Sequence, residues 1–173
     1  LAAGSVFAQS RYTSEVFSQV NVTSDVTYGT NIDFLTSDFS DPAQVQADIT
    51  AIKTAVATGQ PIPAQYFDPA DPTSDVKVTE VEMDIYEPVG DTATNRPLAI
   101  YIHTGNFLPP GINGGINGSK NDSSVIVMCQ KLAKRGFVAI APNYRLGWNP
   151  LDPNQFVRRA QLLNAVYRAI HDM

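Results

Sequence analysis

The sequence predicts an α/β fold in which a mostly parallel sheet carries an antiparallel amino-terminal edge and is flanked by helices. Two uncharged apolar segments, residues 98–102 and 137–141, are separated by an amphipathic helical stretch, an order typical of a βαβ unit. A more polar, roughly alternating segment at residues 76–86 precedes them and is typical of an antiparallel strand. The helix between the two apolar segments predicts that they pair in parallel through a right-handed crossover.

Composition indicates a globular chain with a core of ordinary size. The 173 residues are 43% hydrophobic and 17% charged, which excludes disordered and collagen-like classes. Residues 1–100 hold 4 basic and 14 acidic side chains, and residues 101–173 hold 8 and 3, for a net charge of −5. This balance argues against a nucleic-acid surface.

No run approaches the roughly 20 apolar residues of a transmembrane helix, so no transmembrane segment is predicted.

Cysteine usage excludes two further classes. Cys129 is the single cysteine and lies in an apolar helical stretch, so the chain alone forms neither a disulfide framework nor a cysteine metal site. We expect a buried structural thiol there, and no metal and no cofactor.

The first nine residues are similar to the tail of a secretory signal peptide. They are small and apolar, and Val6-Phe7-Ala8 fits the small-x-Ala pattern that precedes cleavage. An ordinary alanine-rich leader is the alternative. The sequence thus divides into a signal-peptide remnant at 1–9, amino-terminal strands, helix and proline-rich loop at 10–75, and a main unit at 76–173, with a secreted or periplasmic location.

The amino-terminal elements follow in order. Loose alternation over residues 14–35 predicts one or two short strands. Asp41 followed by Pro42 predicts the start of a helix that ends near Gly59. Four prolines in residues 60–75 prevent a regular helix and indicate a linker or covering loop.

The main unit begins with the strand at 76–86, whose polar face places it near the sheet edge. Because residues 98–102 carry no charge on either face, we expect a parallel strand covered by helices on both sides. The helix that follows begins near Asn121 or Asp122 and ends at Gly136, after three basic residues that favour its carboxyl end.

The last helix is predicted to begin with Asp152 as N-cap, Pro153 at its first position and Gln155 close to a capping box. Its apolar residues form one stripe: Phe156, Ala160, Leu163, Val166, Tyr167 and Ile170. No stop signal precedes Met173. We therefore expect the stripe to cover a sheet whose other strands are not in this sequence, which is a prediction of truncation at the carboxyl end and also at the amino end.

Three segments together resemble a known family. Residues 84–88, 100–107 and 134–147 are similar to the amino-terminal half of α/β-hydrolase carboxylesterases of the lipase and cholinesterase-like type. The resemblance covers about residues 76–173. It implies an incomplete α/β-hydrolase fold and a small-molecule carboxylic ester as substrate.

The resemblance also implies an oxyanion hole. His103 takes the histidine position of the family's His-Gly-Gly-Gly-Phe-like turn, and the amides of Gly105 and Asn106 take the positions that stabilise the oxyanion. Thr104 and Asn106 depart from the usual glycines, although Asn tolerates positive φ. His103 and Thr104 are expected to support the loop. A general-base role for His103 is not expected, because the family's catalytic histidine lies near the far carboxyl end.

Further residues have weaker implications. Phe107 and Trp148 are candidates to line a substrate pocket, and Arg145 matches an arginine that makes a buried structural ion pair in the family. The glycine-rich loop at 111–118 lacks the lysine of a phosphate-binding loop and is expected at the rim of the site.

The nucleophile is the missing part. No Gly-x-Ser-x-Gly occurs in the chain, so the nucleophile, acid and histidine are expected after Met173. The parent protein is then a serine esterase, and this chain alone is predicted to be inactive. The alternative is a non-catalytic cholinesterase-like binding or adhesion module. A nucleotide-dependent enzyme is disfavoured, because the turn after residue 102 lacks GxGxxG spacing.

Overall fold

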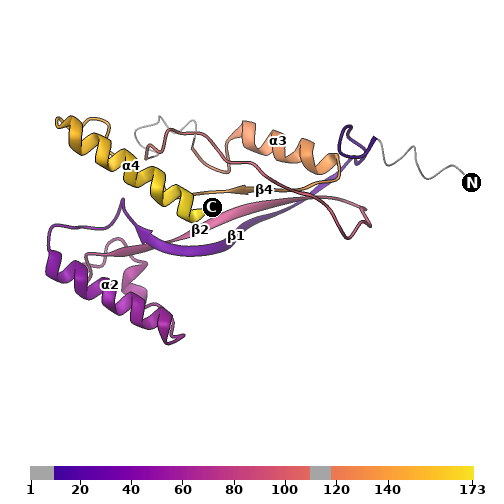
Figure 1. The fold of residues 1–173 in the computed structure, drawn as a ribbon. Coiled ribbons are helices and arrows are strands. Elements are labelled where there is room, and N and C mark those ends of the chain that lie inside the picture. The colour runs from indigo at the N-terminus through magenta and orange to yellow at the C-terminus, as the bar shows by residue number, and fades with distance from the viewer. Residues whose placement is uncertain (1–9, 110–117) are drawn as a thin grey trace, which may run out of the picture.

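The structure is a computed structural model that describes residues 10–109 and 118–173. Its elements are β1 (Val20–Asp33), α2 (Pro42–Ala57), the short 3-10 helix η1 (Ala64–Tyr66), β2 (Lys77–Pro88), β3 (Leu98–Ile100), α3 (Ser123–Lys134), β4 (Val138–Pro142) and α4 (Gln155–Asp172). The strands form one sheet with helices beside it (Figure 1). The signal-like segment 1–9 and most of the glycine-rich loop lie outside the described residues. Within those residues, no helix has the length and apolar character needed to cross a membrane.

The sheet is mixed and mostly antiparallel, with strand order β1-β2-β4-β3. The β1–β2 and β2–β4 pairs are antiparallel, and only β3–β4 is parallel. The parallel pairing predicted for the two apolar segments is confirmed, but the prediction of a mostly parallel sheet is wrong. The reason is that β2 pairs antiparallel with both of its neighbours, and the one parallel pair joins the two short strands β3 (3 residues) and β4 (5 residues).

Helix α3 covers one face of this sheet. It begins after Asp122 and is followed by Gly136 at φ 99°, as the capping residues predicted. A core lies beneath it: Tyr86, Val125, Cys129, Ala133, Ala139 and Ala141. Cys129 is fully buried, and burial raises the pKa of its thiol to about 11. The expected structural role of this cysteine is confirmed.

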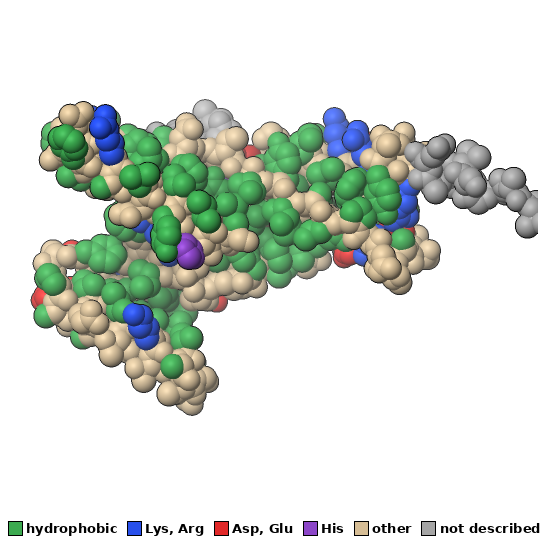
Figure 2. All heavy atoms as spheres, viewed as in Figure 1, with side chains coloured by type: hydrophobic (Ala, Val, Ile, Leu, Met, Phe, Trp, Pro, Cys, Tyr) green, Lys and Arg blue, Asp and Glu red, His purple; other side chains and the backbone are tan. Residues whose placement is uncertain are grey.

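The opposite face of β3 is uncovered. Ala99 and Tyr101 pack against the core under α3, whereas Leu98 and Ile100 are more than half exposed and Ile102 is 44% exposed. The prediction that this strand is covered on both sides is therefore wrong, because β3 is an edge strand with a helix on one face only. Figure 2 shows hydrophobic side chains spread across the middle of the molecule in this view.

Helix α4 buries a different face from the one its apolar stripe predicted. Its buried residues are Ala165, Ala169 and Asp172, while four members of the predicted stripe are more than 60% exposed: Phe156, Leu163, Tyr167 and Ile170. Small side chains allow the helix to approach the segment after β4 closely.

The start of α4 is also corrected. Asn154, not Asp152, is the N-cap, and its side chain accepts a hydrogen bond from the Phe156 amide at 2.9 Å. Asp152 instead accepts the Asn154 amide at 2.8 Å, which closes a turn around Pro153 before the helix begins.

Helix α2 begins and ends where the sequence predicted, with Asp41 as N-cap. Asp48 is buried on α2 and accepts the amides of Asp75 at 2.7 Å and Val76 at 3.1 Å, which fixes the helix to the start of β2. The proline-rich segment is a covering loop, since its Tyr66 joins a second core with three other residues: Ile52, Val76 and Val78.

Candidate functional site

The predicted oxyanion turn begins three residues after the end of β3, and its residues lie outside the sheet's hydrogen-bond ladder. The Leu108 amide donates to the Gly105 carbonyl at 2.9 Å, which makes residues 105–108 a tight turn. Its two central residues, Asn106 and Phe107, have φ of 53° and 58°, and Gly105 has φ of 129°. Positive φ is tolerated by Gly and Asn but is costly for an aromatic residue, so the surroundings must hold Phe107 in place.

The carbonyls of residues 104–107 all have a partner within the protein. The Thr104 oxygen lies 2.7 Å from Nδ1 of His103, and the Gly105 oxygen accepts the Leu108 amide. The Asn106 oxygen accepts Nε1 of Trp148 at 2.9 Å. The Phe107 oxygen accepts the amide of Gly147, also at 2.9 Å.

These contacts constrain where the amides of the turn point. In a trans peptide the N–H group points opposite to the carbonyl of the preceding residue, and no peptide described here is cis. The amides of Gly105, Asn106 and Phe107 therefore point away from the partners of the Thr104, Gly105 and Asn106 carbonyls. Within residues 10–109 and 118–173, none of the three amides donates a hydrogen bond to another residue.

His103 is buried and packs inside the site. Its ring stacks on Tyr144 with centroids 4.1 Å apart and planes 5° apart, and the Tyr144 hydroxyl donates to the His103 carbonyl at 3.1 Å. Burial lowers the pKa of His103, so the imidazole is neutral at neutral pH. With Nδ1 donating to Thr104, Nε2 is left as an acceptor, and it has no partner in the described part of the chain. His103 thus ties the turn to the segment after β4.

The segment after β4, Tyr144 to Trp148, holds the turn from the other side. Tyr144 and Leu146 form a buried cluster with Ala169 of α4, and Phe107 packs against this cluster. Phe107 therefore packs into the protein and lines none of the three cavities below, whereas Trp148 lines one of them.

Arg145 anchors that segment. Its guanidinium lies 2.8 Å from the Asp172 carboxylate, and its Nη1 donates to the Ile32 carbonyl at 2.7 Å. The ion pair implied for Arg145 is present. The sequence did not identify Asp172 as its partner, because nothing except its place on α4 distinguishes this aspartate.

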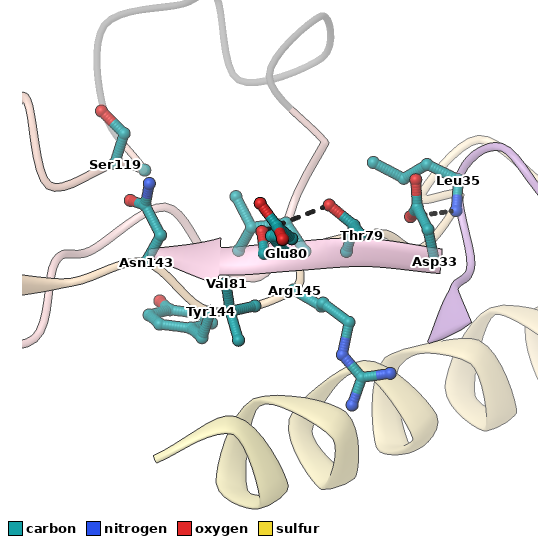
Figure 3. Close-up of a pocket in the computed structure, with 11 residues that line it drawn as sticks. Asp33, Leu35, Thr79, Glu80, Val81, Ser119, Asn143, Tyr144 and Arg145 are labelled. Atoms are coloured by element: carbon teal, nitrogen blue, oxygen red, sulfur yellow. Dashed lines mark hydrogen bonds between the residues drawn. The ribbon is translucent and has the colours of Figure 1, made fainter. Parts of the chain in front are cut away.

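A cavity of about 270 Å³ lies beside the carboxyl end of β4. Figure 3 shows Arg145 extending toward α4, while Asn143 and Ser119 lie together at the other end. The lining residues are Asp33, Leu35, Thr79, Glu80, Val81, Gly118, Ser119, Asn143, Tyr144, Arg145 and Leu146. Neither Gly105 nor Asn106 is among them, so this cavity is not formed by the predicted oxyanion turn.

Two further cavities lie nearby. One of about 240 Å³ is lined by Trp148, Gln155, Arg158, Arg159 and Leu162. The other, about 190 Å³, lies on the uncovered face of the sheet and is lined by Tyr28, Met83, Ile100, Ile140, Pro142, Asp172 and Met173. The first of these two lies near the turn, because its lining residue Trp148 also donates a hydrogen bond to the Asn106 carbonyl.

A buried lysine that the sequence did not indicate lies beside the cavity of about 270 Å³ and contacts its lining residue Asn143. Lys120 is 3% exposed, and its ammonium contacts Asp25 at 2.6 Å and Asp84 at 2.7 Å. Desolvation lowers the pKa of Lys120, but its hydrogen bonds to the two carboxylates outweigh this and leave the pKa raised. Its amide donates to Asn143 at 2.7 Å, which fixes the chain where it leaves the glycine-rich loop. Among the described residues, no cluster of side chains is suited to hold a metal ion.

Comparison with known proteins gives one distant likeness. No protein-family model matches the chain, and no curated protein matches it. A solved structure of brefeldin A esterase, described as a bacterial homologue of human hormone-sensitive lipase, is 15% identical with a TM-score of 0.32. The likeness covers 75% of this chain and 36% of that protein, so the chain spans little more than a third of its length.

Proposed function

We propose that this chain is the amino-terminal part of a carboxylic ester hydrolase and supplies its oxyanion-hole turn. The donors are the backbone amides of Gly105 and Asn106, supported by His103 and Thr104. The nucleophile, acid and histidine come from sequence outside these 173 residues, since no Gly-x-Ser-x-Gly occurs within them. The proposed substrate is a small carboxylic ester. The signal-like residues 1–9 support a secreted or periplasmic location as part of the same proposal.

One observation carries the proposal: the carbonyls of Thr104 and Gly105 are both engaged inside the protein. Their peptide N–H groups consequently face the opposite way and have no partner among the described residues. Fixed donors that no described residue occupies, on a turn that follows a sheet strand, are what a developing oxyanion requires, because the donors need no reorganisation during the reaction.

The chemistry would be acyl transfer. A serine attacks the ester carbonyl, a histidine accepts the serine proton and returns it to the leaving alcohol, and an acid orients the histidine. The carbonyl oxygen becomes negative in the tetrahedral intermediate, and the amides of Gly105 and Asn106 would stabilise it. Losing one such donor typically raises the barrier by about 2.7 to 4 kcal/mol.

The first experiment examines the chain itself. The 173-residue protein is labelled with ¹⁵N and titrated with butylphosphonate, an oxyanion with a short alkyl chain. We expect the largest shift changes at the amides of Gly105 and Asn106. Shift changes spread evenly over the surface, or confined to other amides, would contradict the proposal.

The second experiment examines the longer gene product with a short-chain aryl ester. Gly105→Ala should lower kcat by about 10² to 10³ with little change in KM, because φ 129° disfavours a side chain and the turn must shift. Gly90→Ala is the matched control, since Gly90 also has positive φ (79°) and open space around it, far along the chain from the turn. Equal effects of the two substitutions would contradict an oxyanion role.

A second candidate function is a non-catalytic, cholinesterase-like binding module. The observation that favours it is the presence of Thr104 and Asn106 where the family turn usually has glycine. The two candidates differ at the nucleophile elbow downstream in the gene. A serine there, together with ester turnover, supports the hydrolase, while glycine or asparagine there supports the binding module.

A further inference from the structure

The cavity beside Trp148 has the chemistry of a site for an organic anion. The residues that line it are Trp148, Gln155, Arg158, Arg159 and Leu162, which combine two apolar side chains with two arginines and one amide. No acidic side chain lines it. The volume, about 240 Å³, suits a small organic molecule or a substituent of a larger one.

The two arginines lie near the amino-terminal end of α4, where the helix dipole does not favour cations. They are the fourth and fifth residues of α4, and the first turn of α4 holds no acidic residue. The amino-terminal end of a helix carries partial positive charge, so cations there cost stability instead of adding it. The position of Arg158 has a partial structural reason, since its guanidinium donates a hydrogen bond to the Asp152 carbonyl. Arg159 is exposed, and in the described part of the chain it makes no hydrogen bond or ion pair.

The cavity is connected to the proposed oxyanion turn through a single side chain. Trp148 lines the cavity and donates its Nε1 hydrogen to the Asn106 carbonyl at 2.9 Å. A group bound in this cavity would therefore lie within one side chain of the turn, on the side of its carbonyls, so an ester that also reaches the amides must extend around the turn.

We propose that this cavity binds a carboxylate carried by the substrate, so that the esters preferred by the protein are monoesters of dicarboxylic acids or similar anionic esters. Guanidinium groups match carboxylate geometry and bind it in a bidentate manner, and the indole and Leu162 contact the carbon skeleton. That the bound carboxylate belongs to a substrate rests on the proposed ester hydrolase function. The binding of a carboxylate itself does not depend on catalysis.

Intrinsic fluorescence provides a direct test, because Trp148 is the only tryptophan in the chain. The 173-residue protein is titrated with cyclohexanecarboxylate and, separately, with cyclohexanecarboxamide, which has the same shape without the charge. We expect the carboxylate to change Trp148 emission and to bind at least about tenfold more tightly than the amide. The double variant Arg158→Gln/Arg159→Gln should lose this preference, and Arg159→Gln alone should weaken carboxylate binding by about tenfold.

The matched control is Lys131→Gln, which removes one positive charge from the exposed side of α3 and should leave binding unchanged. Equal affinity for carboxylate and amide, or an equal loss in Lys131→Gln and Arg159→Gln, would overturn the proposal. A circular dichroism melt of each variant ensures that lost binding is not lost folding.

The outcomes separate the two proposals. If Gly105→Ala abolishes hydrolysis by the longer gene product while carboxylate binding persists, both proposals stand. If neutral esters are hydrolysed at the same rate as monoesters of succinate, the proposed preference for anionic esters is wrong, while the proposed hydrolase function remains supported. If no ester is hydrolysed but carboxylate binding requires the arginines, the cavity is a carboxylate-binding site and the proposal of a hydrolase is wrong.

Discussion

Arg145 and Asp172 form an ion pair that joins the segment after β4 to the end of α4. The closest guanidinium and carboxylate atoms are 2.8 Å apart, the Asp172 side chain is fully buried, and the Arg145 side chain is 10% exposed. Asp172 also accepts the Arg145 amide at 2.8 Å and the Asn31 side chain at 2.8 Å. One carboxylate therefore fixes β1, α4 and the segment that supports the candidate site.

The first prediction concerns the loss of this carboxylate. Asp172→Ala should lower the free energy of unfolding by about 3 to 5 kcal/mol, because the Arg145 guanidinium is left buried without its counter-ion. Urea denaturation followed by circular dichroism measures the change.

Glu15→Ala provides the control, since Glu15 is an exposed carboxylate and its removal should change stability by less than about 0.5 kcal/mol. A similarly small change in Asp172→Ala would show that the pair does not hold these elements together.

The second prediction concerns pH. Burial lowers the pKa of His103, so the unfolded chain binds a proton at higher pH than the folded chain does. The contribution of His103 to stability is complete above the unfolded value, about 6.5, and it is lost as the pH falls from there through the lowered folded value. Unfolding free energies at pH 7.5 and 5.0 should differ more for the natural chain than for His103→Phe, which keeps a ring against Tyr144.

The chain has only two histidines, so His171→Asn is a matched control for that measurement. We expect it to retain the pH dependence of the natural chain, because His171 lies on the exposed side of α4. Identical pH dependence in all three proteins would mean that His103 is not held neutral by burial.

The third prediction isolates the hydrogen bond between Trp148 and Asn106. Trp148→Phe keeps an aromatic ring but removes the Nε1 donor, and it should cost about 1 kcal/mol of stability. It should also shift the ¹⁵N and amide proton resonances of Phe107, whose N–H belongs to the same peptide as the Asn106 carbonyl. Tyr167→Phe, which removes an exposed hydroxyl from α4, should leave those resonances in place. Unchanged resonances in Trp148→Phe would show that the bond does not position the turn.

Local signals in the sequence predicted the elements well. Asp41 with Pro42 marked the start of α2, Gly136 marked the end of α3, and the uncharged segments marked two strands that pair in parallel. The two helix boundaries depend on neighbouring residues, since capping chemistry sets them, whereas the parallel pairing was expected from the helix that separates the two segments.

Long-range features could not be read in the same way. Whether the outer side chains of β3 are covered depends on what packs on that face, and the pattern of Leu98 and Ile100 is the same in both cases. Likewise, the α4 stripe marked an apolar face, but the close approach of Ala165 and Ala169 determined which face is buried. The ion pairs of Lys120 and Arg145 join residues more than 25 positions apart, and no local pattern indicates such partners.

The last prediction concerns Gly147, the glycine that holds the Phe107 carbonyl. Gly147 has φ 132°, and a Cβ added there would lie 2.6 Å from Cδ2 of Leu35, which is too close for two carbon atoms. Gly147→Ala should therefore cost more than the roughly 1 kcal/mol expected for Gly90→Ala, where φ is 79° and no atom lies within 4 Å of the added Cβ. Relief of the clash must move either Leu35 or the Gly147 amide, and movement of the amide would break its bond to Phe107. Thermal melts of the two variants compare stability, and the Gly105 and Asn106 amide resonances report whether the turn moves. If Gly147→Ala and Gly90→Ala have the same melting temperature and the Gly105 and Asn106 resonances are the same in both, residues 144–148 do not hold the turn in the way these contacts indicate.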